Sequence, residues 1–384
     1  MQIIFGAESL LLPLTGVGNY SAALLRGLRG DQRISWVRCF AHHLWLADPL
    51  TQGALPEAAA FAGLRRLARA ATRRIPGAAS LLPRPRPPDY RTMLNESGAS
   101  LYHEPNFILR PFDGPTVATI HDLSVLRHPE FHPADRVDYM TRHLAETVAR
   151  ASRLITVSDA MRAEMMAMLN LPPERISVIH NGVGPEYRPM SAAELAPVLS
   201  PYKLCAGRYL LVVSTIEPRK NLGRLLDAYE ALPATLQQRF PLVVAGAPGW
   251  RNEKLLERLA SLSRNGKVRR LGYVPAELLP ALYAGARGFV FPSLYEGFGL
   301  PVIEAAASGV PVLSSRGTAM AEVLGNEGLL ADPDDAAALR DGMQRLIEDD
   351  ELAAAARAAA ASFAERFSWT ACIEQTISLY QELV

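Results

Sequence analysis

The chain has 384 residues, of which 49% are hydrophobic and 21% charged, and its formal net charge is +1. This length fits two domains of ordinary size, and the composition is that of a globular protein. The near-zero net charge provides no overall field for binding nucleic acid, so we expect no nucleic-acid partner. The three cysteines lie far apart and form no CxxC pair. They indicate a reducing compartment and suggest neither a zinc site nor a disulfide framework.

The first residues predict a strand rather than a targeting segment. The stretch 1–16 lacks the basic start of a signal peptide, and Glu8 interrupts its apolar residues. No uncharged apolar run in the sequence approaches the ~18 residues that a membrane-spanning helix needs. We therefore expect a cytoplasmic protein, with at most a peripheral association with the inner face of the cytoplasmic membrane.

Short apolar runs rich in β-branched and aromatic residues alternate with helical patterns along the chain. In the first half these runs are 2–7, 35–42, 100–104, 116–121, 154–158 and 176–180. In the second half they are 209–216, 241–246, 268–274, 288–292, 311–315 and 328–331. Buried strands that alternate with helices predict parallel sheets covered on both faces. Two such series predict an α/β protein of two doubly wound, Rossmann-like domains.

We place an N-terminal domain at residues 1–188 and a C-terminal domain at residues 189–365. A last helix at about 366–384 is expected to pack back on the first domain. In open parallel sheets, ligands bind at the carboxyl ends of the strands. Polar residues follow the expected strands at such ends, for example at His121, Ser158, Glu217, Gly246 and Tyr295. A cleft between the two domains would bring these residues together.

The segment 293–309, SLYEGFGLPVIEAAASG, predicts a strand end, a glycine loop and a short helix. Pro301 suits the first helical position, and Gly309 suits the position just after the helix. Gly297 and Gly299 lack Cβ atoms, so backbone N–H groups in the loop can approach a ligand. The positive end of the helix points to the same place, which favours an anion.

Two glutamates, Glu296 and Glu304, occur in this segment. Each could be an ordinary surface acid, in a loop and in the first turn of a helix respectively. As ionised acceptors they could instead bind the vicinal hydroxyls of a sugar and of a ribose. Together with an anion site, they provide the groups that a nucleotide sugar needs.

The segment EPRKN places Arg219 and Lys220 next to the start of a helix that Asn221 could cap. Cations are unfavourable at a helix N-terminus unless an anion lies between them and the helix dipole. A solvated basic turn is the simpler interpretation. The position at a strand end favours a diphosphate-binding segment.

Two further sites are weaker candidates. Gly16 and Gly18 lie in a loop between the first strand and a helix expected at 21–28. This pattern lacks the third glycine and the acidic residue of a dinucleotide site, so it favours a loop that a phosphate or an acceptor approaches. His121 ends an apolar strand and is followed by Asp122, which favours a functional role over a structural one.

Two charged segments have simple explanations. The acidic run at 332–335 predicts a turn whose last residue, Asp335, caps the next helix, and no metal site. The segment 58–91 has one acidic residue and eight arginines, at positions 65, 66, 69, 73, 74, 84, 86 and 91. The part from Arg65 to Arg86 could bind an anionic membrane surface, or it could form a solvated loop.

These motifs resemble those of the retaining glycosyltransferases of family 4, which have the GT-B fold. The segment 293–309 resembles the family motif of two glutamates separated by seven residues. IEPRKN at 216–221 resembles the phosphate-binding segment of the mannosyltransferase-like branch, and HNGV at 180–183 resembles the entry to the second domain. TGVGNY, TIHDL and ITVSDAMRAEM resemble first-domain signatures. The resemblance implies two Rossmann-like domains that face each other across a cleft, an acceptor-binding domain at residues 1–188 and a nucleotide-sugar-binding domain at residues 189–365.

The resemblance also implies roles for individual residues. Glu296 and His121 would contact the donor sugar, and Arg219 and Lys220 would neutralise the departing diphosphate. Nucleotide and sugar binding would involve Glu304, Phe298, Gly299, Leu300, Gly297, Gly16, Gly18, Gly246, Tyr273 and Val274. Among these, Glu304 would hold the ribose, and the base would dock at the turn of Tyr273 and Val274. Many family members have Gly-Arg where this chain has Ser214-Thr215, so the cationic role would fall on Arg219.

The implied reaction is hexose transfer with retention, by attack of the acceptor hydroxyl on the face from which the diphosphate leaves. No metal and no other cofactor is implied, and the nucleotide sugar is a co-substrate. The branch favours a GDP-linked mannose or related deoxyhexose as the donor. The acceptor would be a lipid-linked glycan of a surface polysaccharide or O-antigen.

Four alternatives remain open from the sequence. A glycosyltransferase of the UDP-glucose type could use another acceptor, and a hydrolase or phosphorylase acting on glycans could share the fold. A non-catalytic sugar-nucleotide-binding protein could keep the fold while losing the charged motifs. A dinucleotide-dependent oxidoreductase is disfavoured by the glycine pattern.

Overall fold

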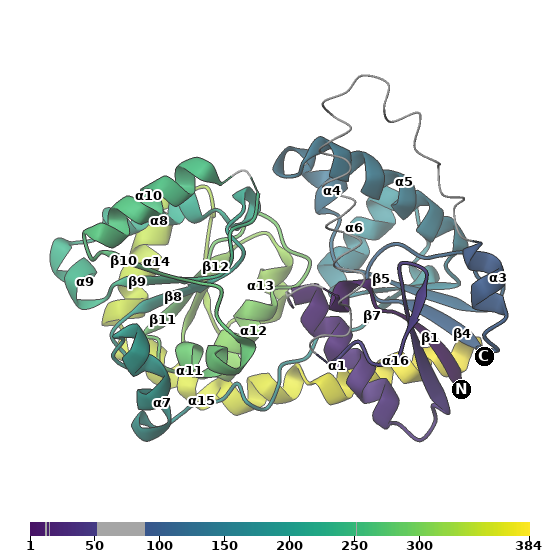
Figure 1. The fold of residues 1–384 in the computed structure, drawn as a ribbon. Coiled ribbons are helices and arrows are strands. Elements are labelled where there is room, and N and C mark those ends of the chain that lie inside the picture. Colours follow the sequence, from purple (N-terminus) through teal and green to yellow (C-terminus); the bar gives the residue numbers. More distant parts are fainter. Residues whose placement is uncertain (12–13, 15, 52–88, 251) are drawn as a thin grey trace, which may run out of the picture. The chain divides into compact units, whose positions relative to one another are not determined.

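The computed structural model describes residues 1–11, 14, 16–51, 89–250 and 252–384 (Figure 1). It contains one sheet in each half of the chain, and helices flank the sheets. Each apolar run that was expected to form a strand does so, with ends that differ by a few residues. The predicted α/β class, with two Rossmann-like parallel sheets, is confirmed.

The first sheet has the strand order β3-β2-β1-β4-β5-β6-β7. Its strands are β1 (Gln2–Gly6), β2 (Trp36–Ala41), β3 (Leu44–Leu46), β4 (Leu101–Glu104), β5 (Thr116–Ile120), β6 (Arg153–Thr156) and β7 (Ile176–Val178). β1 pairs in parallel with β2 and β4, whereas β3 is antiparallel to β2. β3 was not predicted. The turn before it contains His42 and His43, both at positive φ, instead of the glycine or asparagine that usually signals such a turn.

The second sheet has the strand order β10-β9-β8-β11-β12-β13, and all of its pairs are parallel. Its strands are β8 (Leu210–Val213), β9 (Leu242–Ala245), β10 (Val268–Gly272), β11 (Gly288–Phe291), β12 (Val312–Ser315) and β13 (Leu329–Ala331). This is the doubly wound order, in which the chain proceeds outward in one direction from β8 and in the other from β11. The carboxyl ends of β8 and β11 therefore form a topological switch point, where such folds bind ligands.

Side chains alternate between the two faces of the second sheet, and each face has its own core. Tyr209, Leu211, Phe289 and Phe291 belong to one core, which the helices α7, α11, α12, α13 and α15 complete. Leu210, Val212, Val244, Val290 and Leu313 belong to the other, with α8, α9, α10 and α14. Burial on both faces explains why these strands are continuous apolar runs in the sequence.

The helices were predicted less exactly than the strands. Those that precede the second sheet are α1 (Gly16–Gly30), α3 (Tyr90–Asn95), α4 (Ser124–Arg127), α5 (Ala134–Arg150), α6 (Asp159–Leu169) and α7 (Ala192–Leu199). Those that follow β8 are α8 (Leu222–Glu230), α9 (Ala234–Arg239), α10 (Glu253–Arg264), α11 (Leu279–Ala284), α12 (Leu300–Ala307), α13 (Ala319–Leu324), α14 (Ala336–Glu348), α15 (Asp350–Arg366) and α16 (Trp369–Leu383). The first helix was expected only from residue 21, because its two glycines suggested a loop. Gly16 and Gly18 instead lie in its first turn.

The chain forms two compact units. The first comprises Met1–Thr119, His143–Leu154 and Ile377–Val384, and the second comprises Ile120–Arg142 and Ile155–Thr376. The domain boundary expected at residue 188 stays a prediction. In the first unit, the end of α16 is tied to the sheet, because the Tyr380 hydroxyl lies 2.5 Å from His103 Nδ1. The second unit contains the whole second sheet and its switch point.

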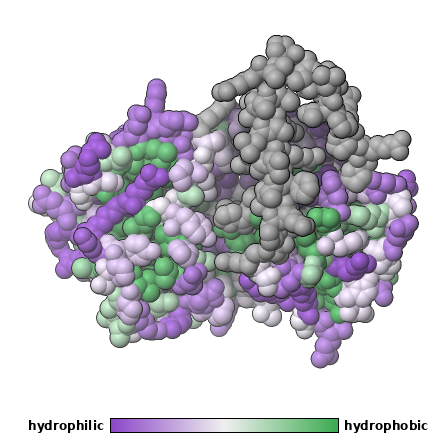
Figure 2. Space-filling view, viewed as in Figure 1, coloured by the Kyte–Doolittle hydropathy of each residue, from purple (hydrophilic) through white to green (hydrophobic). Residues whose placement is uncertain are grey.

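Hydrophilic and hydrophobic side chains are interspersed over the described surface that Figure 2 shows. Among the described residues, no helix combines the length and apolar character that crossing a membrane requires. The arginine-rich stretch from Arg65 to Arg86 lies outside the described residues.

Candidate active site at the switch point of the second sheet

The two charged motifs of the second half of the chain meet at the switch point. The chain leaves β8 into a short 3-10 turn, Pro218–Lys220, and leaves β11 into the loop that precedes α12. β8 and β11 are neighbours in the sheet, so these loops lie side by side. A backbone hydrogen bond joins them, in which Leu294 N–H donates to the Arg219 carbonyl over 2.9 Å. EPRKN and the double-glutamate segment therefore form one site.

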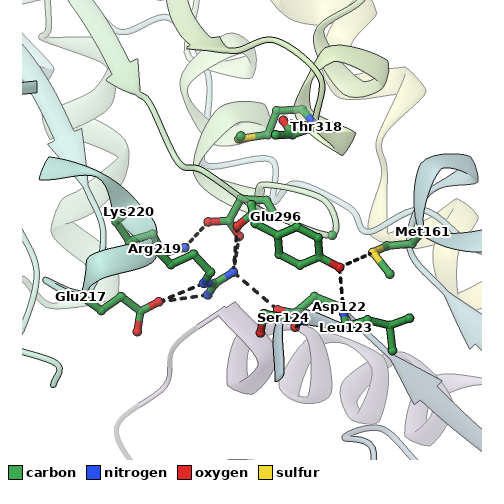
Figure 3. A network of polar contacts seen from close by, with 12 residues as sticks. Asp122, Leu123, Ser124, Met161, Glu217, Arg219, Lys220, Glu296 and Thr318 are labelled. Atoms are coloured by element: carbon green, nitrogen blue, oxygen red, sulfur yellow. Dashed lines mark hydrogen bonds and ion pairs between the residues drawn. The ribbon is translucent and has the colours of Figure 1, made fainter. Parts of the chain in front are cut away.

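Arg219 is the centre of this site (Figure 3). Its Nε and Nη2 donate to Glu217 Oε1 over 3.2 and 3.0 Å. Its Nη1 donates to Glu296 Oε2 over 3.1 Å and to the Tyr295 carbonyl over 3.2 Å, and lies 3.5 Å from Asp122 Oδ2. Only 14% of the Arg219 side chain is exposed. The guanidinium is thus held in one orientation by acceptors from three segments of the chain.

Lys220 completes the cluster. Its Nζ donates to Glu296 Oε1, so that each carboxylate oxygen of Glu296 binds one of the two adjacent cations. The ammonium also lies 5.1 Å from the centre of the Phe291 ring, within the range of a cation–π contact. The Lys220 and Glu296 side chains are 13% and 10% exposed. The acid expected to bind the sugar and the cations expected to bind the diphosphate are therefore direct partners.

The charged groups of the cluster shift one another's pKa values. Burial raises the pKa of Glu296, but Arg219 and Lys220 outweigh it, and the net effect is a lowered pKa. The pKa of Asp122 is likewise lowered, because Arg219 and hydrogen bonds from Ser124 outweigh burial. Burial lowers the pKa of Arg219, but the attraction of Glu296, Asp122 and Glu217 outweighs burial, and the net effect is a raised pKa. The pKa of Lys220 is lowered by burial and by its neighbour Arg219.

Glu304 lies in a different environment. It is a buried residue in the middle of α12, 9% exposed, and its Oε2 accepts a hydrogen bond from the Tyr283 hydroxyl over 2.8 Å. Burial raises the pKa of Glu304, and hydrogen bonds from Tyr283 and Tyr187 offset part of this rise. The resulting pKa is about 7. The interpretation of Glu304 as a surface acid in a first helical turn is wrong, because α12 packs this side chain against α11.

The glycine loop is shaped by close backbone contacts. A Cβ on Gly297 would lie 1.7 Å from the carbonyl oxygen of His121, so only glycine fits there. The Ser158 hydroxyl donates to the Gly297 carbonyl over 2.7 Å. Gly299 has φ of +99° and precedes the first residue of α12, so the loop turns into the helix in a conformation that favours glycine. Gly309 has φ of +75° just after the helix, as predicted.

The structure gives contacts to residues for which the sequence predicted no individual role. Glu217 orients Arg219, although it had been noted only for its place after a strand and within its motif. The Tyr295 hydroxyl donates to Glu164 Oε2 over 2.7 Å and accepts from the Leu123 N–H over 3.0 Å. Tyr283, on α11, binds Glu304. A tyrosine in an apolar run has no sequence signal that separates such a role from simple packing.

The remaining candidates lie as follows. His121 is half-buried, and Gly246, after β9, packs against the carbonyl of Ser214. Tyr273 is exposed, whereas Val274 is buried in the core. Phe298 is buried as well, and Leu300 is the first residue of α12. Gly16 and Gly18 belong to the first unit, and the other candidates belong to the second.

Two predicted caps have different outcomes. Asp335 caps α14 as expected, since its Oδ1 accepts from Ala337 N–H and Ala338 N–H over 2.8 and 3.0 Å. Asn221 occupies the residue before α8 but does not cap it with its side chain. It has a left-handed backbone, and its Nδ2 instead donates to the Pro333 carbonyl over 2.7 Å.

One set of side chains in the described residues has the spacing of a metal site, namely Asp159, His180 and Glu322. The two oxygens of Glu322 already accept from the N–H groups of Asp159 and Ala160 at the start of α6, over 3.0 and 2.8 Å. His180 Nε2 lies 3.3 Å from the same carboxylate. These contacts explain the arrangement without a metal ion.

Comparisons with known proteins identify relatives over both halves of the chain. Residues 206–363 match the family described as glycosyl transferases group 1, and residues 15–187 match glycosyltransferase family 4. The chain is 39% identical to the O-antigen chain mannosyltransferase B of Escherichia coli over 383 residues, which covers 100% of both proteins. It is 33% identical over 264 residues to the serotype-specific mannosyltransferase WbdA of Escherichia coli, covering 66% of this chain and 32% of that protein.

Solved structures share the fold. Sucrose-phosphate synthase from Thermosynechococcus elongatus has a TM-score of 0.74 and 20% identity, with 100% of this chain and 98% of that chain covered. WaaG, a glycosyltransferase involved in lipopolysaccharide biosynthesis, has a TM-score of 0.67 and 17% identity, with coverage of 95% and 98%. The full-length similarity and the family matches over both halves lead to one assignment: this chain belongs to the GT-B glycosyltransferases of group 1 and family 4.

Proposed function

We propose that the protein is a retaining mannosyltransferase that moves mannose from GDP-mannose to a lipid-linked glycan acceptor in O-antigen synthesis. The observation that carries this proposal is the cluster of Arg219, Lys220 and Glu296 at the switch point of the second sheet. The full-length similarity to an O-antigen chain mannosyltransferase supports the mannosyl donor and the acceptor class.

In this proposal the diphosphate binds Arg219 and Lys220. Both cations now bind Glu296, and a diphosphate would compete with that carboxylate for them. Glu217 and Asp122 stay with Arg219 and keep its guanidinium oriented. Glu296, once displaced, is a free acceptor for hydroxyls of the donor sugar. Donor binding therefore exchanges one anion for another at the cations and does not leave a buried charge without a partner.

The bond changes follow from retention at the anomeric carbon. The acceptor oxygen forms a bond to this carbon on the face from which the diphosphate leaves, while the bond from carbon to phosphate oxygen breaks. The proton of the acceptor hydroxyl passes to the leaving phosphate. Arg219 and Lys220 stabilise the charge that develops on the diphosphate, a task that a metal ion performs in other enzymes. We therefore propose catalysis without a metal and without another cofactor.

The other candidates complete the proposed donor site. Glu304 accepts hydrogen bonds from the ribose, and the backbone of Phe298, Gly299 and Leu300 contacts the sugar and phosphates at the start of α12. His121 contacts the donor sugar, and Gly297 and Gly246 allow close backbone approach. The base docks at the turn of Tyr273 and Val274.

Removal of either cation should abolish transfer. We expect Arg219→Ala and Lys220→Ala each to lower kcat at least ~100-fold, the usual effect of losing one group that stabilises a developing charge. The measurement is transfer of labelled mannose from GDP-mannose to a synthetic alkyl mannoside, with UDP-glucose in parallel. Arg224→Ala is the control, because Arg224 lies on α8 close in sequence but is 41% exposed. Normal turnover in Lys220→Ala would refute the proposed role of Lys220 in binding phosphate. Transfer from UDP-glucose but not from GDP-mannose would show that the donor is UDP-glucose.

Removal of Glu296 should abolish transfer but strengthen the binding of the product GDP. In Glu296→Ala we expect no detectable transfer, because a sugar-binding acceptor is lost. GDP should bind several-fold more tightly, because Arg219 and Lys220 no longer have Glu296 as a competing anion. Calorimetric titration with GDP measures this, and Glu257→Ala on the exposed side of α10 is the control. Weaker GDP binding in Glu296→Ala would contradict the exchange of anions.

Chelation of divalent cations should leave transfer intact. Two protein cations already lie where the diphosphate is proposed to bind, so EDTA is expected to change the initial rate less than twofold. A complete loss of activity that magnesium alone restores would show that a metal ion carries the charge.

We also propose that the arginine-rich segment from Arg65 to Arg86 brings the enzyme to anionic membranes, where a lipid-linked acceptor resides. The support is the sequence itself, since basic segments gain about 1 kcal/mol per Lys or Arg near an anionic surface. Deletion of residues 58–86 should abolish sedimentation with vesicles that contain phosphatidylglycerol. Replacement of arginines 65, 66, 69, 73 and 74 by glutamine should have the same effect at unchanged length. Sedimentation equal to that of the wild type in both variants would defeat this proposal.

A further inference from the structure

Glu304 is held by a partner on another helix. Its carboxylate lies on α12, is 9% exposed, and accepts a hydrogen bond from the Tyr283 hydroxyl of α11 over 2.8 Å. Tyr187, from the segment before α7, hydrogen-bonds the same carboxylate. An acid buried to this degree is stable only when such donors satisfy it.

The Tyr283 hydroxyl is fixed by the packing of its ring. The ring is fully buried, with its centre 5.2 Å from that of Phe289 on β11 and 5.8 Å from that of Tyr187, both in edge contact. The core on this face of the sheet includes all three rings. A side chain held in this way cannot rotate its hydroxyl away from Glu304 without opening the core.

The carboxylate retains unused capacity as an acceptor. An ionised glutamate has about four lone-pair sites on its two oxygens. The two phenols use one site each, so about two remain for further donors. A ribose presents two neighbouring hydroxyls, which is the number and the chemical type of donor that such a carboxylate accepts.

We propose that Tyr283 is a positioning residue for nucleotide binding, which acts by holding Glu304 where its remaining lone pairs meet the ribose hydroxyls of the donor. This inference rests on the proposed function, because that function assigns the ribose to Glu304. It adds a residue outside the charged motifs, and it assigns to α11 a part in donor affinity that does not involve the chemical step.

The ionisation of Glu304 supports this role. Burial raises its pKa to about 7, Tyr283 and Tyr187 lower it by hydrogen bonding, and Glu186 raises it by repulsion. The ionised form is the better acceptor for ribose hydroxyls, so affinity for the ribose should rise as the pH increases through this range. Loss of the Tyr283 hydroxyl removes one lowering contribution, so this rise in affinity should move to higher pH.

The test compares two nucleotides in the same variant. GDP and 2′,3′-dideoxy-GDP differ only in the ribose hydroxyls, and their phosphates titrate alike, so the ratio of their Kd values isolates the ribose contacts. In Tyr283→Phe we expect GDP to bind about tenfold more weakly, the effect of losing one hydrogen bond in this network, while the dideoxy nucleotide binds as to the wild type. The KM for GDP-mannose should rise by a similar factor with kcat unchanged. The pH range over which GDP gains affinity relative to the dideoxy nucleotide should move to higher pH.

Tyr209→Phe is the matched control. Its hydroxyl is buried in the same core but donates to the Leu282 carbonyl over 2.6 Å, so its loss should leave the ratio of Kd values unchanged. Tyr187→Phe should raise the Kd of GDP relative to that of the dideoxy nucleotide, as Tyr283→Phe does, which provides a second variant if Tyr283→Phe folds poorly. An unchanged ratio in a folded Tyr283→Phe would overturn the inference. So would equal binding of both nucleotides by the wild-type protein, because Glu304 would then not contact the ribose.

The proposed function fails by a different observation. If the wild type transfers no mannose from GDP-mannose, the assignment of the reaction is wrong, whatever the Kd ratio. If the wild type does not bind GDP, the donor base is wrong, and the same ratio measured with UDP and its dideoxy analogue decides on Tyr283. Both nucleotides contain the ribose that the inference concerns.

Discussion

The site depends on one electrostatic constraint: two cations adjacent in sequence are almost fully buried and must find counter-charges. An unpaired cation in such a place would be costly to bury. Arg219 and Lys220 meet this requirement with Glu217 from their own turn, Asp122 from the segment after β5, and Glu296 from the loop after β11. The topology of the sheet makes this possible. β11 lies beside β8, so the two loops leave the sheet at neighbouring points although they are far apart in sequence.

The same constraint connects the fold to the proposed chemistry. Counter-charges that are side chains can be exchanged for counter-charges that belong to a ligand, provided that the cations stay in place. Arg219 is held by acceptors that include the Tyr295 carbonyl and Glu217, neither of which has to move when a ligand arrives. Glu296 is the partner with contacts to both cations, and it is the partner that the proposed function releases towards the sugar. Preorganised cations of this kind stabilise developing charge without further rearrangement.

Much of this arrangement could be predicted from the sequence because it depends on local patterns. Continuous apolar runs identified the strands, since burial on both faces removes alternation, and Gly309 marked the end of α12. Predictions failed where contacts between distant segments determined the local conformation or the partner of a side chain. Gly16 and Gly18 suggested a loop, yet they lie in the first turn of α1, where packing of the helix outweighs the ~1 kcal/mol that a glycine costs in a helix. Asparagine is a residue type that often caps helices, but the side chain of Asn221 donates to the Pro333 carbonyl instead. The role of Tyr283 required knowledge of which elements become neighbours, because its partner Glu304 lies on another helix.

The two glutamates of one motif show why spacing alone does not determine chemistry. Glu296 lies in the loop at the switch point and Glu304 lies in α12, and both side chains are mostly buried. Cations lower the pKa of Glu296, whereas the described residues that donate hydrogen bonds to Glu304 are phenols, and burial raises its pKa to about 7. The difference arises from the elements that face each residue, the turn after β8 for one and α11 for the other. Environments that move two similar acids apart are typical of sites where the acids have different tasks. A charged partner suits an acid that a ligand displaces, whereas neutral partners suit an acid that stays in place and accepts hydroxyls.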